Sequence, residues 1–219
     1  MKLLLTSGGL INQLIATALF DLVGKKAQDI SIVFIPTASN VEVGDKSWLI
    51  NDLVNLKKQN FKSIDIADIS AVDEEVWRPK LEAADVLFFE GGSTYHLMTW
   101  LNKSGLVKLL PELLKTKVYV GVSAGSMVTC KDLALKMTLT LYEADPVKVK
   151  NIPCLSLVDF YFLPHLNSSD FNLRKESFIK EAANGITEKI YVLDDNSALK
   201  IVDGKIEVIS EGEWFVLNS

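Results

Sequence analysis

The alternation of short strand-like runs with helical patterns over the first 122 residues constrains the fold most strongly. The strand-like runs, most of them apolar or β-branched, are residues 2–6, 31–35, 62–66, 86–89 and 118–122. Helical spacing of apolar residues recurs between them, in residues 11–23, 48–56, 73–83, 95–101 and 106–114. Apolar strands separated by helices are typical of a parallel sheet that is covered on both faces. We therefore expect an α/β fold, a three-layer sandwich with a mostly parallel sheet.

The regular rhythm ends after residue 122, and the remaining chain predicts additional strands. Residues 157–163 are strand-like, residues 171–183 have a helical pattern, and residues 190–193 and 198–202 are again strand-like. Asp203-Gly204 is a hairpin signal, with residues 205–209 as the returning strand. This pattern predicts an antiparallel C-terminal hairpin. Because 219 residues contain no linker or internal repeat, we expect a single domain over residues 1–219.

Charge and composition argue against several classes of partner. A formal net charge of −5 disfavours binding to nucleic acid or to an anionic membrane. No apolar run approaches the ~20 residues of a membrane span, and Ser7-Gly8-Gly9 and Asn12-Gln13 interrupt the apolar start, so we expect no signal peptide. Cys130 and Cys154 form no C-x-x-C motif, and two histidines do not complete a zinc site. A cytoplasmic protein with free thiols and no metal is expected.

A possible nucleophile follows the last of the regular strand-like runs. Gly121-x-Ser123-x-Gly125 matches the nucleophile elbow, a strained strand-to-helix turn that exposes a serine. Residues 126–130 are a plausible short helix, whose N-terminal amides would stabilise negative charge near Ser123. The alternative is a serine-glycine turn without chemistry. The position of the motif after a buried strand favours the nucleophile.

Serine needs a base, and the chain offers two histidines for that role. His165 follows an apolar strand and a proline, at the strand end where open α/β sheets place functional residues. His96 lies inside a helical pattern, where a packed structural histidine is the simpler interpretation. We therefore favour His165 as the base, with a structural histidine as the alternative.

A carboxylate would orient the histidine, and the spacing of the residues leaves its identity open. One candidate pair, Asp194-Asp195, closes a strand that comes after His165. An α/β-hydrolase order of serine, acid and histidine would instead favour residues between Ser123 and His165. Those candidates are Asp132, Glu143, Asp145 and Asp159.

Four segments together resemble the peptidase E and cyanophycinase family of serine peptidases. They are Phe89-Glu90-Gly91-Gly92-Ser93-Thr94, Gly121-Val122-Ser123-Ala124-Gly125-Ser126, Pro164-His165 and Leu193-Asp194-Asp195-Asn196-Ser197-Ala198-Leu199. The resemblance implies a flavodoxin-like or class I glutamine-amidotransferase-like fold. It also implies a triad of Ser123, His165 and Asp195, although this family usually has glutamate at the position of Asp195. Glutamine amidotransferases match less well, because they need cysteine at Ser123 and glutamate at Asn167.

The same resemblance implies further site residues. The N–H groups of Gly92 and Ala124 would form the oxyanion hole. Peptidase E-like enzymes cleave dipeptides after an N-terminal aspartate, and Arg174 matches the arginine that receives the aspartate side chain. The segment 166–173 is shorter than in enzymes of that specificity, and a solvated charge at a helix start is the alternative for Arg174. We also expect Ser93 to contact the substrate.

The predicted function is hydrolysis of small peptides by a serine-type peptidase that needs no cofactor. One alternative is a hydrolase of β-aspartyl, cyanophycin-like peptides or of esters. Another is a catalytically silent binding protein that keeps the elbow. Nucleotide binding at Ser7-Gly8-Gly9 is disfavoured, because neither phosphate-binding glycine motif is present there. The sequence makes no prediction of oligomeric state.

Overall fold

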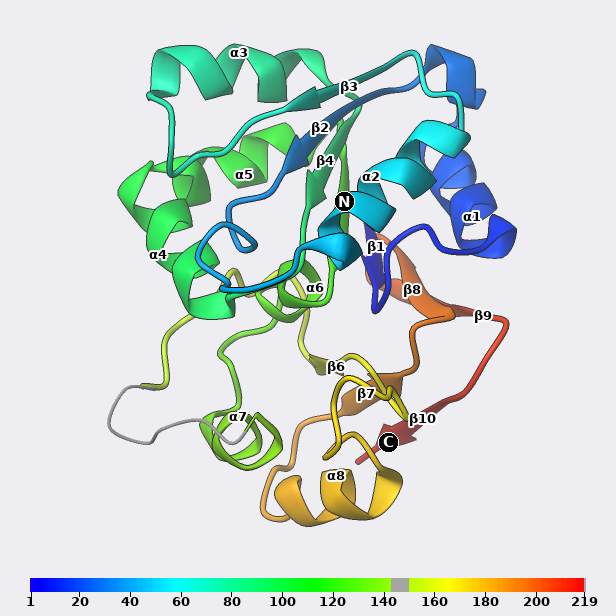
Figure 1. The fold of residues 1–219 in the computed structure, drawn as a ribbon, viewed down its shortest axis with the longest axis vertical. Coiled ribbons are helices and arrows are strands. Elements are labelled where there is room, and N and C mark those ends of the chain that lie inside the picture. Colours follow the sequence, from blue (N-terminus) through cyan, green and yellow to red (C-terminus); the bar gives the residue numbers. More distant parts are fainter. Residues whose placement is uncertain (143–149, 219) are drawn as a thin grey trace.

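A mostly parallel sheet forms the larger part of the molecule (Figure 1). The computed structural model describes residues 1–142 and 150–218. Within them, the sheet has the strand order β3-β2-β4-β5-β1-β8-β9. Its strands are β1 (Lys2–Thr6), β2 (Ser31–Ile35), β3 (Ser63–Ile66), β4 (Val86–Phe89), β5 (Val118–Val122), β8 (Ser197–Val202) and β9 (Lys205–Ser210). The first five pair in parallel, and β8 and β9 add an antiparallel hairpin beside β1. The predicted mostly parallel sheet and C-terminal hairpin are confirmed.

Helices cover both faces of this sheet, which confirms the three-layer α/β prediction (Figure 1). Helices α1 (Gln13–Val23) and α2 (Ser47–Lys58) pack on one face, and a short 3-10 helix, η1 (Ala27–Asp29), follows α1. Helices α3 (Glu74–Ala83), α4 (Thr94–Lys103) and α5 (Leu106–Leu113) pack on the other. Successive strand residues point to opposite faces, so Phe88 packs with the α1 and α2 side and Phe89 with the α3 to α5 side.

A smaller sheet, which the sequence did not predict as a separate unit, lies below the larger one in Figure 1. Its strand order is β10 (Trp214–Leu217), β7 (Ile190–Leu193) and β6 (Tyr161–Leu163). Strand β6 pairs in parallel with β7, and β10 pairs antiparallel with β7. Helices α7 (Leu135–Leu141) and α8 (Glu176–Ala182) lie beside it. Neither α7 nor β10 was predicted from the sequence.

Two expected elements begin several residues later than the sequence pattern suggested. The expected strand 157–163 is ordered as a strand only over β6. The expected helix 171–183 begins only at Glu176, because the Arg174 N–H bonds the Phe171 carbonyl and the Arg174 carbonyl accepts from the Asn167 N–H. These bonds hold residues 171–174 in a turn that continues back toward His165.

The carboxyl ends of five strands from both sheets converge on one region. Helix α6 (Ala124–Met127) starts directly after β5, two residues before the expected helix at 126–130. Ser7, Glu90 and Ser123 follow β1, β4 and β5 of the larger sheet. His165 and Asp195 follow β6 and β7 of the smaller sheet. Strand ends that meet in this way are the usual place for a site in an open α/β sheet.

Candidate active site

Ser123 stands on a strained turn between β5 and α6. Its backbone φ is 46°, in the left-handed region that a residue with a side chain rarely adopts. The glycines on either side permit this turn. A Cβ at Gly125 would lie 2.1 Å from the carbonyl oxygen of Phe89, and one at Gly121 would lie 2.6 Å from the Gly125 backbone. The Gly121-x-Ser123-x-Gly125 sequence therefore forms the elbow that its spacing predicted.

A chain of two short hydrogen bonds connects Ser123, His165 and Asp195. His165 Nε2 lies 2.8 Å from Ser123 Oγ, and His165 Nδ1 lies 2.7 Å from Asp195 Oδ1. The imidazole stacks on Phe171, with ring centroids 4.4 Å apart and planes 10° from parallel. The structure thus brings together the three residues that the sequence analysis favoured, in the arrangement of nucleophile, base and orienting acid.

Ser7 belongs to this network, although sequence analysis assigned it no role. Its hydroxyl donates to Asp195 Oδ1 over 2.7 Å and accepts the backbone N–H of His165 over 2.8 Å. Burial alone would raise the pKa of Asp195, but the hydrogen bond and charge of His165 and the Ser7 hydroxyl lower it overall. The position of Ser7 directly after a buried strand was the available signal, because functional residues gather at strand ends.

The turn after β4 lies against the elbow. Gly92 has φ 123°, and a Cβ there would lie 2.4 Å from the Ala38 carbonyl oxygen, so only glycine fits. Ser39 Oγ also donates to the Gly91 carbonyl over 3.0 Å. A Cβ at Gly91 would lie 3.4 Å from that of Ser123. The turn therefore packs closely between the loop after β2 and Ser123.

The two expected oxyanion donors have free backbone N–H groups. Within residues 1–142 and 150–218, neither the Gly92 N–H nor the Ala124 N–H donates a hydrogen bond. Ser93 caps helix α4, because its hydroxyl accepts the His96 N–H over 3.2 Å. The structure gives Ser93 this capping role beside the turn, and its expected contact with substrate stays a prediction.

The other candidates for base and acid lie away from this network. His96 makes no hydrogen bond to Ser123 and packs beside Trp100, with ring centroids 6.2 Å apart. Asp159 is exposed to solvent. Asp194 accepts bonds from the Ser197 hydroxyl and from two backbone N–H groups, and it therefore shapes the turn that carries Asp195. Glu143 and Asp145 lie outside the described residues.

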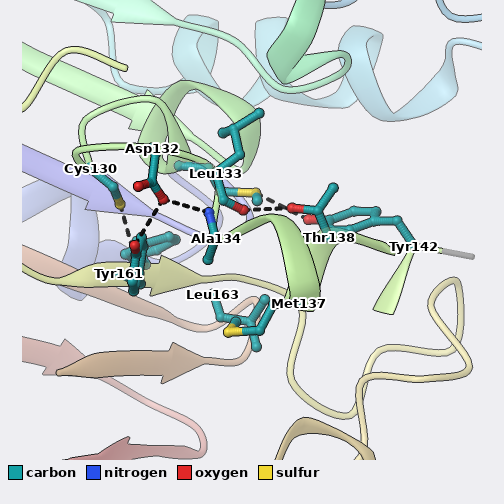
Figure 2. Close-up of a pocket in the computed structure, with 11 residues that line it drawn as sticks. Cys130, Asp132, Leu133, Ala134, Met137, Thr138, Tyr142, Tyr161 and Leu163 are labelled. Atoms are coloured by element: carbon teal, nitrogen blue, oxygen red, sulfur yellow. Dashed lines mark hydrogen bonds between the residues drawn. The ribbon is translucent and has the colours of Figure 1, made fainter. Parts of the chain in front are cut away.

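The remaining candidate acid, Asp132, lines a separate small cavity, which Figure 2 shows. Its carboxylate accepts the Tyr161 hydroxyl and the Ala134 N–H, each over 2.8 Å. The cavity has a volume of about 10 Å³, at the lower limit of what one water molecule needs. Its lining residues are Met127, Cys130, Asp132, Leu133, Ala134, Met137, Thr138, Tyr142, Tyr161, Phe162 and Leu163. Asp132 therefore has a structural role, in a cavity too small for a peptide.

Arg174 is fully buried, so it is not the solvated charge that was the alternative for it. Its Nη1 donates to the Leu141 carbonyl over 2.8 Å, and its Nε donates to the Pro164 carbonyl over 3.2 Å. The guanidinium lies over Tyr142, 4.1 Å from the ring centroid, and near Phe171, which stacks on His165. Within the described chain, Nη2 has no hydrogen-bond partner and no carboxylate pairs with the guanidinium.

Among the described residues there is neither a metal-binding cluster nor a helix that could span a membrane. No group of three or more His, Cys, Asp or Glu side chains in this part of the chain is arranged to hold a metal ion. No helix there has both the length and the apolar composition needed to cross a membrane. Cys130 and Cys154 are free thiols, and burial raises the pKa of each to about 12. These thiols are therefore poor nucleophiles at neutral pH.

This chain is similar in sequence to bacterial peptidases. Residues 3–209 match the family model described as peptidase family S51. An uncharacterized peptidase of Listeria monocytogenes is 31% identical over 186 residues, which cover 83% of this chain and 85% of that protein. A peptidase E of Shewanella oneidensis is 31% identical over 137 residues, which cover 62% of this chain and 53% of that protein.

Solved structures share the fold over nearly the whole chain. A candidate peptidase E from Listeria monocytogenes superposes with a TM-score of 0.77 and 26% identity, covering 96% of this chain and 98% of that one. A peptidase from an acI-B1 Actinobacterium superposes with a TM-score of 0.69, covering 100% of this chain and 94% of that one. At 17% identity, the second likeness concerns the fold alone.

Proposed function

Because the chain belongs to peptidase family S51 and is a serine peptidase, we propose that Ser123, His165 and Asp195 are its catalytic triad. The observation that carries this proposal is the continuous pair of hydrogen bonds, 2.8 Å and 2.7 Å long, that ends on a serine at a strained elbow. A nucleophile, a base within hydrogen-bond reach and a carboxylate on the other ring nitrogen are what serine-type acyl transfer requires.

The proposed mechanism is acyl transfer to water. Ser123 Oγ attacks the peptide carbonyl carbon while its proton passes to His165 Nε2. The N–H groups of Gly92 and Ala124 stabilise the negative oxygen of the tetrahedral intermediate. The C–N bond then breaks, and His165 transfers the proton to the leaving amine. Water then attacks the carbonyl carbon of the acyl-enzyme while one of its protons passes to His165. The bond between the acyl group and Ser123 Oγ breaks, the acid product leaves, and His165 returns the proton to Ser123, with Asp195 stabilising the imidazolium in both halves.

We propose small peptides as substrates, with dipeptides that carry an N-terminal aspartate as the preferred class. Arg174 supports this preference, because it is a buried cation without a carboxylate partner in the described chain, and buried charges are normally paired. A substrate carboxylate would supply the missing partner. Phe171 connects Arg174 to the base, since it lies against both the guanidinium and the imidazole. The two free thiols support a cytoplasmic location.

Hydrolysis of a dipeptide panel by the wild type and by matched variants tests the triad and its specificity. The panel carries Asp, Glu and neutral residues at the N-terminus, with chromogenic esters and β-aspartyl dipeptides as the alternative substrates. We expect Ser123→Ala and His165→Ala to lower kcat at least about 10³-fold. His96→Ala, the matched histidine control, should keep wild-type activity. Loss of activity in His96→Ala with retention in His165→Ala would overturn the assignment.

Labelling with a fluorophosphonate separates a peptidase of different specificity from a silent binding protein. An intact triad reacts at Ser123 whatever the natural substrate, and mass spectrometry identifies the modified residue. We expect labelling of the wild type and none of Ser123→Ala. A protein that neither labels nor hydrolyses any substrate of the panel would contradict the proposed mechanism.

A further inference from the structure

Two acidic side chains meet directly behind the turn that follows β4. Glu90 precedes Gly91 and has no exposed surface, and Asp52 reaches it from helix α2. Within residues 1–142 and 150–218, no side chain donates a hydrogen bond to either carboxyl oxygen of Glu90, and only the adjacent Gly91 N–H favours its ionised form. Such a group is costly to bury as an anion, so its charge state must differ from that of a surface glutamate.

A proton shared by the two side chains resolves this conflict. Two carboxylates only accept hydrogen bonds, whereas a protonated carboxyl can donate to an ionised one. Burial and the charge of Asp52 raise the pKa of Glu90 well above its ordinary range. Burial raises the pKa of Asp52 to about 6, with the charge of Asp195 adding to the effect and the Glu90 hydrogen bond opposing it. A protonated Glu90 can therefore donate a hydrogen bond to the ionised Asp52 carboxylate.

The surroundings of the pair are anionic. Asp195 lies across the Ser7-Gly8-Gly9 loop, since a Cβ at Gly8 would lie 3.0 Å from the Cβ of Asp195 and one at Gly9 would lie 2.8 Å from Asp52 Oδ1. In the part of the chain that the structure describes, neither Asp52 nor Glu90 forms an ion pair. No described cation therefore compensates for a second negative charge at this place.

The pair connects helix α2 to the nucleophile through the turn after β4. Trp48 lies one helical turn before Asp52, and its ring atom Cζ3 would be 3.8 Å from a Cβ at Gly91. Gly91 in turn faces Ser123. Helix α2 thus contacts Gly91 through the Trp48 ring. It also contacts Glu90, the residue before Gly91, through the carboxyl group of Asp52.

We propose that the proton shared by Asp52 and Glu90 anchors helix α2 to the Gly91-Gly92 turn and thereby positions the Gly92 N–H toward the oxyanion. The pair is a positioning device, because neither carboxyl touches the reacting atoms. The inference rests on the proposed function, in which Gly92 is an oxyanion donor. Ionisation of Glu90 at alkaline pH would place two negative charges together and release the turn.

Two substitutions of Glu90 test the inference. Glu90→Gln keeps a donor for Asp52 that does not ionise, and it should retain kcat within about 3-fold of the wild type. Glu90→Leu has a similar volume but no donor, and it should lower kcat at least 10-fold with KM changed less than 3-fold. Equal losses in the two variants, or no loss in Glu90→Leu, would overturn the proposal. The alkaline decline of wild-type kcat should be absent in Glu90→Gln, and its persistence there would also contradict the proposal.

Infrared spectroscopy detects the proton without any turnover. The wild type at pH 7 should show the C=O band of a buried carboxylic acid, and Glu90→Gln should lack that band. No such band in the wild type would refute proton sharing even if Glu90→Leu fails to fold. The rate of Ser123 labelling by a fluorophosphonate replaces kcat if no peptide is hydrolysed, because phosphonylation uses the same oxyanion hole. Absence of labelling in the wild type would instead refute the proposed function, while the infrared band still reports on the pair.

Discussion

The Ser7 hydroxyl holds both the orienting carboxylate and the backbone of the proposed base. It donates to Asp195 Oδ1, the same oxygen that His165 Nδ1 contacts, and it accepts the His165 N–H. His165 has φ 69°, so its backbone is in a left-handed conformation that needs support from its neighbours. The buried Ser7 hydroxyl follows a strand of the larger sheet. It therefore holds in place His165 and Asp195, which follow strands of the smaller sheet.

We predict that Ser7→Ala lowers kcat/KM by roughly 5- to 30-fold, as expected for loss of about 1–2 kcal/mol of hydrogen bonding. The pKa of Asp195 is depressed in the folded protein, so activity that needs its carboxylate is present above that pKa and lost as the pH falls through it. Removing the Ser7 donor raises this pKa and moves the acidic loss of activity to higher pH. A pH profile of kcat/KM measures both effects.

Ser31→Ala is the matched control for this prediction. Ser31 also donates its hydroxyl to a carboxylate, that of Asp85 over 2.9 Å, but it lies at the start of β2, at the opposite end of the strands from the candidate site. Its removal should leave the pH profile unchanged. An acidic limb that stays in place in Ser7→Ala would show that the hydroxyl does not act on Asp195.

At the residue scale, local patterns predicted some of the candidate site and missed the rest for a physical reason. The elbow around Ser123 depends on glycines two residues away, so its signal is local. Ser7 acquires its role from a partner 188 positions along the chain, which no local pattern encodes. Asp194 and Asp195 are adjacent in the sequence, so the pattern alone does not say which of them contacts His165. The Asp194 carboxylate instead accepts hydrogen bonds from Ser197 and Glu213, and the Asp195 carboxylate contacts His165.

Among the structural elements, the turn between β4 and α4 tolerates the least change. Gly92 has a positive φ and a backbone neighbour where a Cβ would lie, whereas Gly24, which ends helix α1 at φ 74°, has open space within 4 Å of that position. The two glycines therefore separate the cost of a strained φ from the cost of a steric clash.

We predict that Gly24→Ala costs about 1 kcal/mol of unfolding free energy and leaves kcat unchanged. Gly92→Ala should cost several kilocalories per mole more and should lower kcat at least about 10-fold, because the turn must move away from the Ala38 carbonyl and carry its N–H with it. Urea denaturation and steady-state kinetics of both variants test this. Similar kinetics in the two variants would show that the position of the turn is not critical.

At the element scale, the sequence predicted the larger sheet better than the smaller one. The strands of the parallel sheet that lie between helices are mostly uninterrupted apolar runs, such as Val86–Phe89, and such runs are recognisable locally. The smaller sheet combines β6, β7 and β10 from three separated segments, and β10 is an edge strand whose Trp214 is exposed. Its assembly depends on long-range pairing, which periodicity does not reveal.

For the molecule as a whole, the proposed triad is divided between two sheets that share an apolar core. Ser123 follows a strand of the larger sheet, and His165 and Asp195 follow strands of the smaller one. A single buried apolar cluster runs from Leu87 in β4 through Phe162 in β6 to Ile179 in α8. These residues pack against one another, so separation of the two sheets would expose apolar core surface of both sheets to solvent.

We predict that the two sheets unfold in one transition. The rate of Ser123 labelling by a fluorophosphonate requires the sheets to be docked, whereas far-ultraviolet circular dichroism reports the helices and strands of each. If the shared core makes the docking cooperative, both signals fall at the same urea concentration, as for a two-state protein. Loss of labelling at a clearly lower urea concentration would show that the smaller sheet undocks first and that the single-domain prediction for residues 1–219 is wrong.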